Sequence, residues 1–458
     1  RIRRMEVMTE ELTEARKEVA SPRMTEIADA LADQDDESLI EPGQMEVTIT
    51  RDGFIKRTTL ETFRAQNRGG RGRSGAGTRG DDIVTRSFNG HTHQWVLFFS
   101  SGGKAFRVKV WKLPEAGPTA KGRALVNLLP ELGSDTITTV LPLPQDETLW
   151  DSLHLVFATA SGNVRRNRLS DFRNVRAAGL IAMKLDEGDH LVGVATCREG
   201  DDVLLATRKG RCIRFILSDE QVRVFAGRDS SGVRGIKLLN SDEVISLSVL
   251  RHVQASPEER IAYLKLANAK RRGNGETEAE PPPETDADEY IPEVTLSAER
   301  FADLETAEEM LLTVTDMGFG KRTSAYEYRV TGRGGQGIGN ITLAPRNGKT
   351  VVATFPVRQG DDIMMVTDAG RLIRVPVDQV RTTGRQAMGV TLFRVDKGEH
   401  VTSVFTVLED ETDDNGTAPD DAGVPDGGGP EAGRPDGGLP DGSTDNNDKP
   451  APEDGTDG

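Results

Sequence analysis

The densest group of residues with phosphate-binding chemistry is a short basic segment early in the chain. Its glycines let a backbone approach a phosphate closely, and the arginines between them supply permanently charged donors that can bind two oxygens at once. We therefore predict that this segment contacts a nucleic-acid backbone. It consists of Gln66, Asn67, Arg68, Gly69, Gly70, Arg71, Gly72 and Arg73.

Two arginine patterns recur along the chain. Six times an apolar run ends in a glycine turn and an arginine follows the glycine by four residues. These arginines are Arg57, Arg107, Arg166, Arg214, Arg322 and Arg374. A second glycine follows each first glycine by 17 to 22 residues. Four residues before three of these second glycines stands an arginine, as Arg68 stands before Gly72; the three are Arg228, Arg333 and Arg385. All nine arginines are predicted to bind DNA; the alternative is that they cap strands or pair with carboxylates of the fold.

Other patterns of catalytic or cofactor chemistry are weak. Two Gly-x-Gly-x-x-Gly matches, starting at Gly70 and Gly332, do not open a predicted helix in a βαβ unit, as dinucleotide binding would require. His91 and His93 have no evident third metal ligand, and the four tyrosines lie outside any context typical of a nucleophile. The sequence therefore predicts no catalytic residue, metal site or cofactor within this chain.

The elements that carry the arginines are short β-branched or aromatic runs punctuated by glycine, with roughly four strands in each unit of about 50 residues. This arithmetic predicts an all-β, six-bladed propeller-like ring over residues 45–408, with a stacked solenoid as the alternative. The blades are expected near 45–90, 91–145, 152–198, 201–251, 310–358 and 361–408. The second glycine of a unit is expected to open a strand, such as Gly389–Val395.

The segments outside the predicted blades differ in character. A 3.6-residue apolar period predicts a helix over residues 1–21, followed by an acidic connector to residue 44. The insert 271–309 and the tail 409–458 are rich in Gly, Pro, Asp and Glu and are predicted to be disordered, apart from a short helix near Ser297–Met310. The tail is expected either to compete with DNA for the basic body or only to aid solubility.

The net charge of −16 conceals a strong asymmetry. Residues 1–44, 276–310 and 409–458 carry net charges of −6, −12 and −14, which leaves +16 on the segments with strand patterning. A basic folded body indicates a polyanionic partner such as double-stranded DNA. With two cysteines, no CxxC pair and no long apolar run, a cytoplasmic location is expected. Because the first residue is Arg1, the sequence is expected to begin inside a longer protein.

The basic segment resembles the seven-residue box of the DNA gyrase A-subunit family, Gln-Arg-Arg-Gly-Gly-Lys-Gly, with Asn67 and Arg71 as the two departures. Ser21–Ile27 is similar to the end of that family's coiled-coil arm, and Asp52–Arg57 to its first blade. The resemblance implies a six-bladed β-pinwheel, preceded by a short helix from the arm, that wraps duplex DNA largely independently of sequence. It also implies ATP-dependent negative supercoiling by a heterotetramer of two A and two B subunits. The catalytic tyrosine would lie upstream, and ATP and Mg²⁺ would serve the holoenzyme.

Three other functions fit the repeats less well. The C-terminal domain of a topoisomerase IV A-type subunit is similar, but it lacks an intact box and usually has fewer blades. A propeller that serves as a protein-interaction platform would be expected to have a neutral or acidic repeat region. A propeller enzyme would need convergent acids or metal ligands, which the sequence does not indicate.

Overall fold

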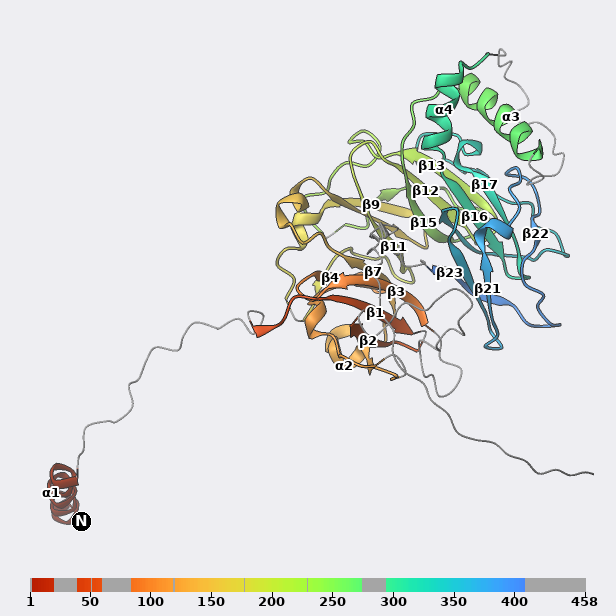
Figure 1. Cartoon of the computed structure of the whole chain (residues 1–458). Coiled ribbons are helices and arrows are strands. Elements are labelled where there is room, and N and C mark those ends of the chain that lie inside the picture. The colour runs from red at the N-terminus through yellow and green to blue at the C-terminus, as the bar shows by residue number, and fades with distance from the viewer. Residues whose placement is uncertain are drawn as a thin grey trace, which may run out of the picture. The chain divides into compact units, whose positions relative to one another are not determined.

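The computed structural model describes residues 2–19, 39–50, 52–59, 84–117, 120–176, 178–228, 230–273 and 294–407 (Figure 1). The basic segment 66–73, most of the acidic connector and the acidic tail 409–458 lie outside the described residues. Helix α1 (Ile2–Val19) confirms the predicted N-terminal helix.

The described strands form six antiparallel sheets, which we number in chain order. Sheet 1 has the order β3 (Val84–His91), β1 (Gln44–Thr50), β2 (Phe54–Thr59), β6 (Arg123–Ala124). Sheet 2 has the order β10 (Leu180–Ile181), β5 (Lys104–Lys109), β4 (Trp95–Ser100), β7 (Ile137–Pro142). Sheet 3 has the order β11 (Leu191–Cys197), β8 (His154–Thr159), β9 (Asn163–Arg168), β14 (Val233–Arg234).

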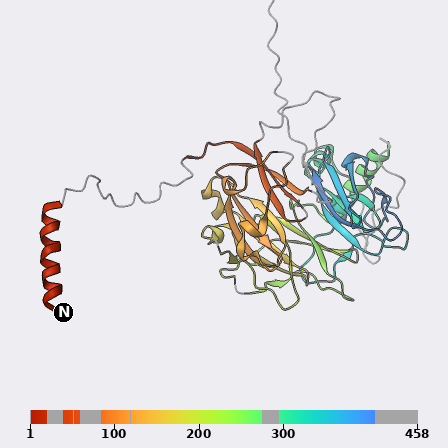
Figure 2. The same cartoon turned by 90° about the horizontal axis from the view of Figure 1, so that it is seen from below.

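The second half repeats this arrangement. Sheet 4 has the order β15 (Val244–Leu250), β12 (Asp202–Thr207), β13 (Arg211–Ile216), β18 (Ile338–Gly339). Sheet 5 has the order β19 (Val351–Val357), β16 (Met310–Thr315), β17 (Phe319–Ser324), β22 (Val390–Thr391). Sheet 6 contains β21 (Leu372–Pro376), β20 (Asp362–Thr367) and β23 (Val401–Val407) among the described residues. The sheets follow one another in chain order, and β23 of sheet 6 contacts β3 of sheet 1 (Figure 1 and Figure 2).

Each two-residue strand belongs to the sheet of the preceding repeat. Strand β14, for example, comes from the fourth repeat but pairs with β9 of sheet 3. The sequence pattern predicted that such a strand pairs inside its own unit, which is wrong. It also predicted a longer strand: β22 covers Val390–Thr391 rather than Gly389–Val395. The second glycine explains the tight fit, because Gly232 has a φ of +83° and a side chain there would meet the Val164 carbonyl oxygen at 2.2 Å. We call these exchanged strands the outer strands.

The hydrophobic core lies between neighbouring sheets. Because successive side chains of a strand point to opposite faces, Val96 and Phe98 of β4 pack toward sheet 1, whereas Leu97 and Phe99 pack toward sheet 3. The ring of Phe99 meets that of Phe157 edge to face at 5.6 Å. Each fully buried side chain of this size stabilises the fold by about 1.5–3 kcal/mol. Because both faces of a central strand are buried, its sequence is a continuous run of apolar residues.

The described ends of the insert between sheets 4 and 5 are more ordered than predicted, and residues 274–293 lie outside the described residues. Helix α4 (Ala298–Ala307) confirms the expected short helix, but α3 (Pro257–Gly273) was not predicted and includes the start of the insert. Ser256 and Glu259 form a reciprocal capping box, with Oγ accepting from the Glu259 N–H at 3.2 Å and Oε2 accepting from the Ser256 N–H at 3.0 Å. This signature, with proline at the first helical position, was available in the sequence.

The remaining short elements lie at the ends of strands. They are α2 (Leu125–Leu128) and the 3-10 helices η3 (Val110–Lys112), η4 (Pro130–Leu132), η5 (Glu147–Asp151), η6 (Leu169–Phe172), η7 (Ala325–Glu327) and η8 (Val377–Gln379). None of the helices in the described part of the chain is long and apolar enough to cross a membrane.

Candidate nucleic-acid interface

Positive charge is concentrated on the outer strands and the loops that lead into them. We call residues 116–124, 173–181, 223–234, 329–339 and 381–391 the outer segments. They contain two, two, three, two and two Lys or Arg residues respectively, and Asp229 is their one acidic residue. Exposed cations among them include Arg123, Arg176, Arg223, Arg234, Arg329 and Arg381. Each outer segment follows the edge of a sheet, so its cations recur at every sheet junction from sheet 1 to sheet 5.

The six arginines that follow a first glycine by four residues have a different environment, and we call them the inner arginines. Arg166 is fully buried and donates to Glu199 and Asp219, both at 2.6 Å. Arg214 is 5% exposed and makes a two-pronged ion pair with the fully buried Asp202, at 2.8 Å from Nε and 2.7 Å from Nη2. It also donates to the Ala325 carbonyl oxygen at 2.7 Å.

The other inner arginines repeat this role with variations. Arg57 pairs with Glu115 at 2.8 Å and donates to the Leu113 carbonyl oxygen at 2.9 Å, and Arg322 donates to the Val380 carbonyl oxygen at 2.6 Å. Their partners belong to the following repeat, and the backbone of Arg57, Arg166, Arg214 and Arg322 forms a parallel bridge to that repeat. These four inner arginines therefore join successive repeats.

Arg107 and Arg374 show how the same position changes between sheets. The Arg107 guanidinium lies over the Trp95 ring at 3.9 Å from its centroid, and burial lowers the pKa of Arg107. Arg374 pairs with Asp362, and its side chain is 50% exposed. Since the inner arginines are largely occupied by intramolecular partners, their burial does not favour direct contact with DNA, which stays a prediction for them.

The three arginines four residues before a second glycine lie in outer segments, half-buried. Arg228 donates to the Asp171 carbonyl oxygen at 3.1 Å, Arg333 donates to the carbonyl oxygens of Gln221 and Arg234, and Arg385 donates to that of Gly339. Their acceptors are main-chain oxygens rather than carboxylates, so their positive charges are not neutralised by these contacts. They are better placed than the inner arginines to face a phosphate.

Sequence reasoning missed a set of buried cations directly before the inner arginines. Lys56, Arg165 and Lys321 are 4%, 0% and 0% exposed and stand in sheets 1, 3 and 5. Each donates to carbonyl oxygens of an outer segment: Lys56 to Gly117 at 3.3 Å, Arg165 to Arg228 at 2.7 Å and Ser230 at 2.9 Å, and Lys321 to Gly384 at 2.8 Å and to Arg385. The equivalent residues of sheets 2, 4 and 6 are Phe106, Ile213 and Ile373. The alternation of charged and apolar residues was visible in the sequence, but their burial was not.

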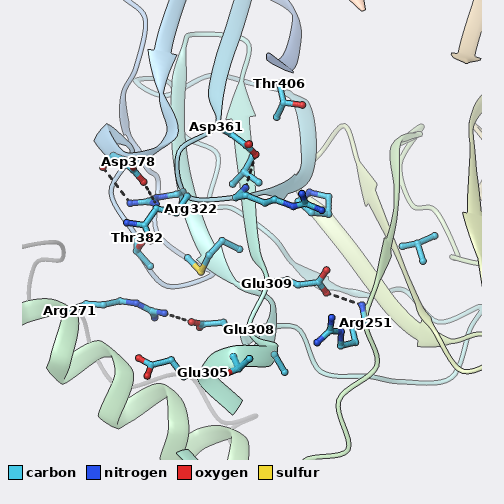
Figure 3. Close-up of a pocket in the computed structure, with 18 residues that line it drawn as sticks. Arg251, Arg271, Glu305, Glu308, Glu309, Arg322, Asp361, Asp378, Thr382 and Thr406 are labelled. Atoms are coloured by element: carbon cyan, nitrogen blue, oxygen red, sulfur yellow. Dashed lines mark hydrogen bonds and ion pairs between the residues drawn. The ribbon is translucent and has the colours of Figure 1, made fainter. Parts of the chain in front are cut away.

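A pocket of about 1140 Å³ lies where the insert meets sheets 5 and 6 (Figure 3). Two ion pairs lie within it: Arg271 with Glu308, and Arg322 with Asp378 at 3.6 Å. The Glu309 carboxylate accepts from the Arg251 backbone N–H at 2.8 Å, and burial raises the pKa of Glu309. These contacts join the insert to sheet 4 and join sheet 5 to the loop that follows β21.

The weaker sequence candidates have structural explanations. The His93 ring Nε2 lies 3.1 Å from the Ile40 carbonyl oxygen, and the His91 ring accepts from the His93 N–H, so the two imidazoles do not converge on a common point. Across the described residues, no group of three or more His, Cys, Asp or Glu side chains is arranged to hold a metal ion.

Comparison with known proteins identifies the family of this repeat. A family model described as the DNA gyrase C-terminal domain, beta-propeller, matches residues 47–86, 94–144, 153–198, 201–251, 309–354 and 361–407. The chain belongs to this family. The six matched segments correspond to the six repeats, and residues 252–308, which include α3 and α4, lie between the fourth and fifth segments.

Curated relatives that match most of the chain are named DNA gyrase A subunits. The DNA gyrase A subunit of Granulibacter bethesdensis is 73% identical over 424 residues, which cover 92% of this chain and 45% of that protein. The corresponding protein of Rickettsia bellii is 45% identical over 415 residues, with 91% and 45% covered. The chain thus spans less than half the length of these relatives. Their names favour gyrase A over the topoisomerase IV alternative.

Solved structures support the fold. The C-terminal domain of DNA topoisomerase IV aligns with a TM-score of 0.58 at 19% identity, over 80% of this chain and 94% of that one. The DNA gyrase A C-terminal domain aligns with a TM-score of 0.53 at 21% identity, over 80% of this chain and all of that one. At these identities the likeness shows the β-pinwheel fold alone, and it confirms the predicted all-β, six-bladed architecture.

Proposed function

We propose that this chain wraps duplex DNA, largely independently of sequence, along the outer segments of its six-bladed pinwheel. The observation that carries the proposal is the charge of those segments, eleven Lys or Arg residues against one acid, repeated at successive sheet junctions. Cations placed along a curved edge would neutralise successive phosphates and offset the cost of bending. Smoothly bending 20–30 base pairs by 40–90° costs about 1–6 kcal/mol, which a few such contacts can exceed.

The proposed contacts fall into two groups. Within the described residues they are the exposed cations of the outer segments together with Arg228, Arg333 and Arg385. The second group is the predicted basic segment 66–73. In the sequence of the first repeat, residues 64–74 occupy the position of an outer segment and add four arginines and no acid. Four inner arginines, Arg57, Arg166, Arg214 and Arg322, we assign instead to joining the repeats.

In the larger protein, we propose that wrapping enables ATP-dependent negative supercoiling by an assembly of two A and two B gyrase subunits in the cytoplasm. The similarity to gyrase A subunits supports this role. The chain itself would supply no catalytic group, because DNA cleavage would be carried out by a tyrosine in the upstream part of the gyrase A protein. ATP and Mg²⁺ would act elsewhere in the holoenzyme.

The decisive experiment measures DNA binding and DNA shape with the purified chain. If Z phosphates are contacted by cations, the logarithm of the binding constant should fall with the logarithm of salt at a slope near about −0.9Z. Wrapping also predicts that the chain introduces writhe into relaxed plasmid after closure by a topoisomerase. A flat salt response, or plasmid closed without a change in linking number, would contradict the proposal.

A further inference from the structure

The buried cations of the odd-numbered sheets have an energetic cost that packing alone does not explain. Removing a charged Lys or Arg side chain from water is unfavourable even after local relaxation, and the cost is recovered only where good hydrogen bonds replace the water. Sheets 2, 4 and 6 fill the same position with Phe106, Ile213 and Ile373, so an apolar side chain is sufficient to pack it. A charge retained at full burial in Arg165 and Lys321 therefore indicates a task beyond packing.

That task can be read from the acceptors. Lys321 draws the carbonyl oxygens of Gly384 and Arg385 inward, and Arg165 draws those of Arg228 and Ser230 inward. A trans peptide unit carries its C=O and its N–H on opposite sides. The amide N–H groups of Arg385 and Gln386 therefore point away from Lys321, and that of Ser231 points away from Arg165.

These amides belong to outer segments that also carry cations. Arg385 belongs to the same loop as the exposed Arg381, and Ser231 lies between Arg228 and Arg234. Successive backbone N–H groups on one side of a turn form an anion-binding concavity, and nearby guanidinium groups strengthen its attraction for phosphate. A buried cation behind the loop fixes the peptide dipoles with their positive ends outward.

We propose that Arg165 and Lys321 are positioning residues for DNA binding. They hold the loops before β14 and β22 so that the backbone amides of Ser231, Arg385 and Gln386 donate to DNA phosphates. The inference rests on the proposed wrapping of DNA around the outer segments. It adds that main-chain contacts occur at the outer strands of sheets 3 and 5, whereas sheet 4, with Ile213, relies on arginine side chains.

The test compares Lys321→Met, which removes the charge, with Lys321→Arg, which keeps it. A matched control is Leu312→Ala, a cavity-forming change in the buried core of the same sheet. For each variant of the full chain, affinity for a linear duplex is measured at low salt, with thermal stability and with hydrogen exchange of residues 384–389 in the presence and absence of the duplex. We expect Lys321→Met to weaken affinity about three- to tenfold, the loss of one hydrogen bond or slightly more.

We also expect the duplex to protect the 385 and 386 amides in the wild-type chain and in Lys321→Arg, but not in Lys321→Met. Leu312→Ala should lose stability and keep its affinity. The inference is overturned if the wild-type chain binds DNA without protection of these amides, or if Lys321→Met keeps both affinity and protection. If Lys321→Met does not fold, Lys321→Gln and the wild-type protection decide in its place. A wild-type chain that does not bind the duplex would instead overturn the proposed function.

Discussion

The four inner arginines that join the repeats and the exposed arginines of the outer segments have the same side chain in opposite environments. Arg214 is 5% exposed and held by a buried carboxylate, whereas Arg234 is exposed on an outer strand of the neighbouring sheet. The inner position repeats more regularly, since it holds arginine in all six units. Regular spacing of a cation in a repeat protein is thus a better indicator of how the repeats are joined than of what they bind.

The difference has a physical origin. Four inner arginines form a backbone bridge to the next repeat, and their side chains meet fixed acceptors, so their places are determined by the fold. A cation that contacts DNA phosphates needs only to be near the outer edge, because the attraction is long-ranged and tolerant of position. Outer cations can therefore shift along a segment from repeat to repeat, which makes them harder to align.

The largest expected effect is on stability, from Arg214→Met. The change leaves Asp202, which is fully buried, without its two-pronged partner, and breaking a buried pair in this way costs about 3–5 kcal/mol. Urea unfolding should show this loss, while the folded fraction should bind a duplex with nearly wild-type affinity. A tenfold loss of affinity in the folded variant would mean that Arg214 contacts DNA after all.

The next effect is on binding, from the double change Arg176→Ala and Arg234→Ala. Both side chains are exposed on outer segments, so we expect about tenfold weaker binding at low salt and a salt slope smaller by about 1.8, with stability changed by less than about 0.5 kcal/mol. The matched control is Arg198→Ala with Arg358→Ala, which removes equal charge from exposed turns between sheets. An equal loss of affinity in the two double variants would mean that net charge, and not its placement on the outer segments, determines DNA binding.

The sequence was sufficient for much of this architecture, because glycine turns and apolar runs report local backbone geometry directly. It did not reveal the strand exchange, since a two-residue strand such as β14 pairs with a partner some 70 residues earlier and has no pattern of its own. It placed Arg166 and Arg228 in different glycine patterns but could not show that Arg166 is fully buried and Arg228 only half-buried. Helix α3 was not predicted, although Ser256-Pro257 and Glu259 form a capping-box pattern that is typical of a helix N-terminus.

A smaller effect is expected from Arg374→Met, which removes the inner arginine of sheet 6. Its side chain is 50% exposed, so water already competes with the pairing to Asp362, and we expect a loss of about 1 kcal/mol in the free energy of unfolding. Urea unfolding beside Arg214→Met measures the difference between two positions that share the same Asp-to-Arg spacing. If both cost the same, exposure would not be what separates them.

The smallest effect is kinetic and uses the two buried thiols as reporters of the sheet junctions. Burial raises the pKa of Cys197 and of Cys212 to about 12, so at pH 8 both thiols are protonated as well as inaccessible, and reaction with a thiol reagent requires opening. In the wild-type chain we expect labelling far slower than in urea. Arg214→Met should accelerate labelling of Cys212, which lies two residues away on β13, because the junction opens more often.

The double variant of Arg176 and Arg234 should label at the wild-type rate, since those cations stabilise no junction. Rapid labelling of the wild-type chain at pH 8 would show that the junctions open without loss of an inner arginine, and the two classes of arginine would then differ less than their burial implies.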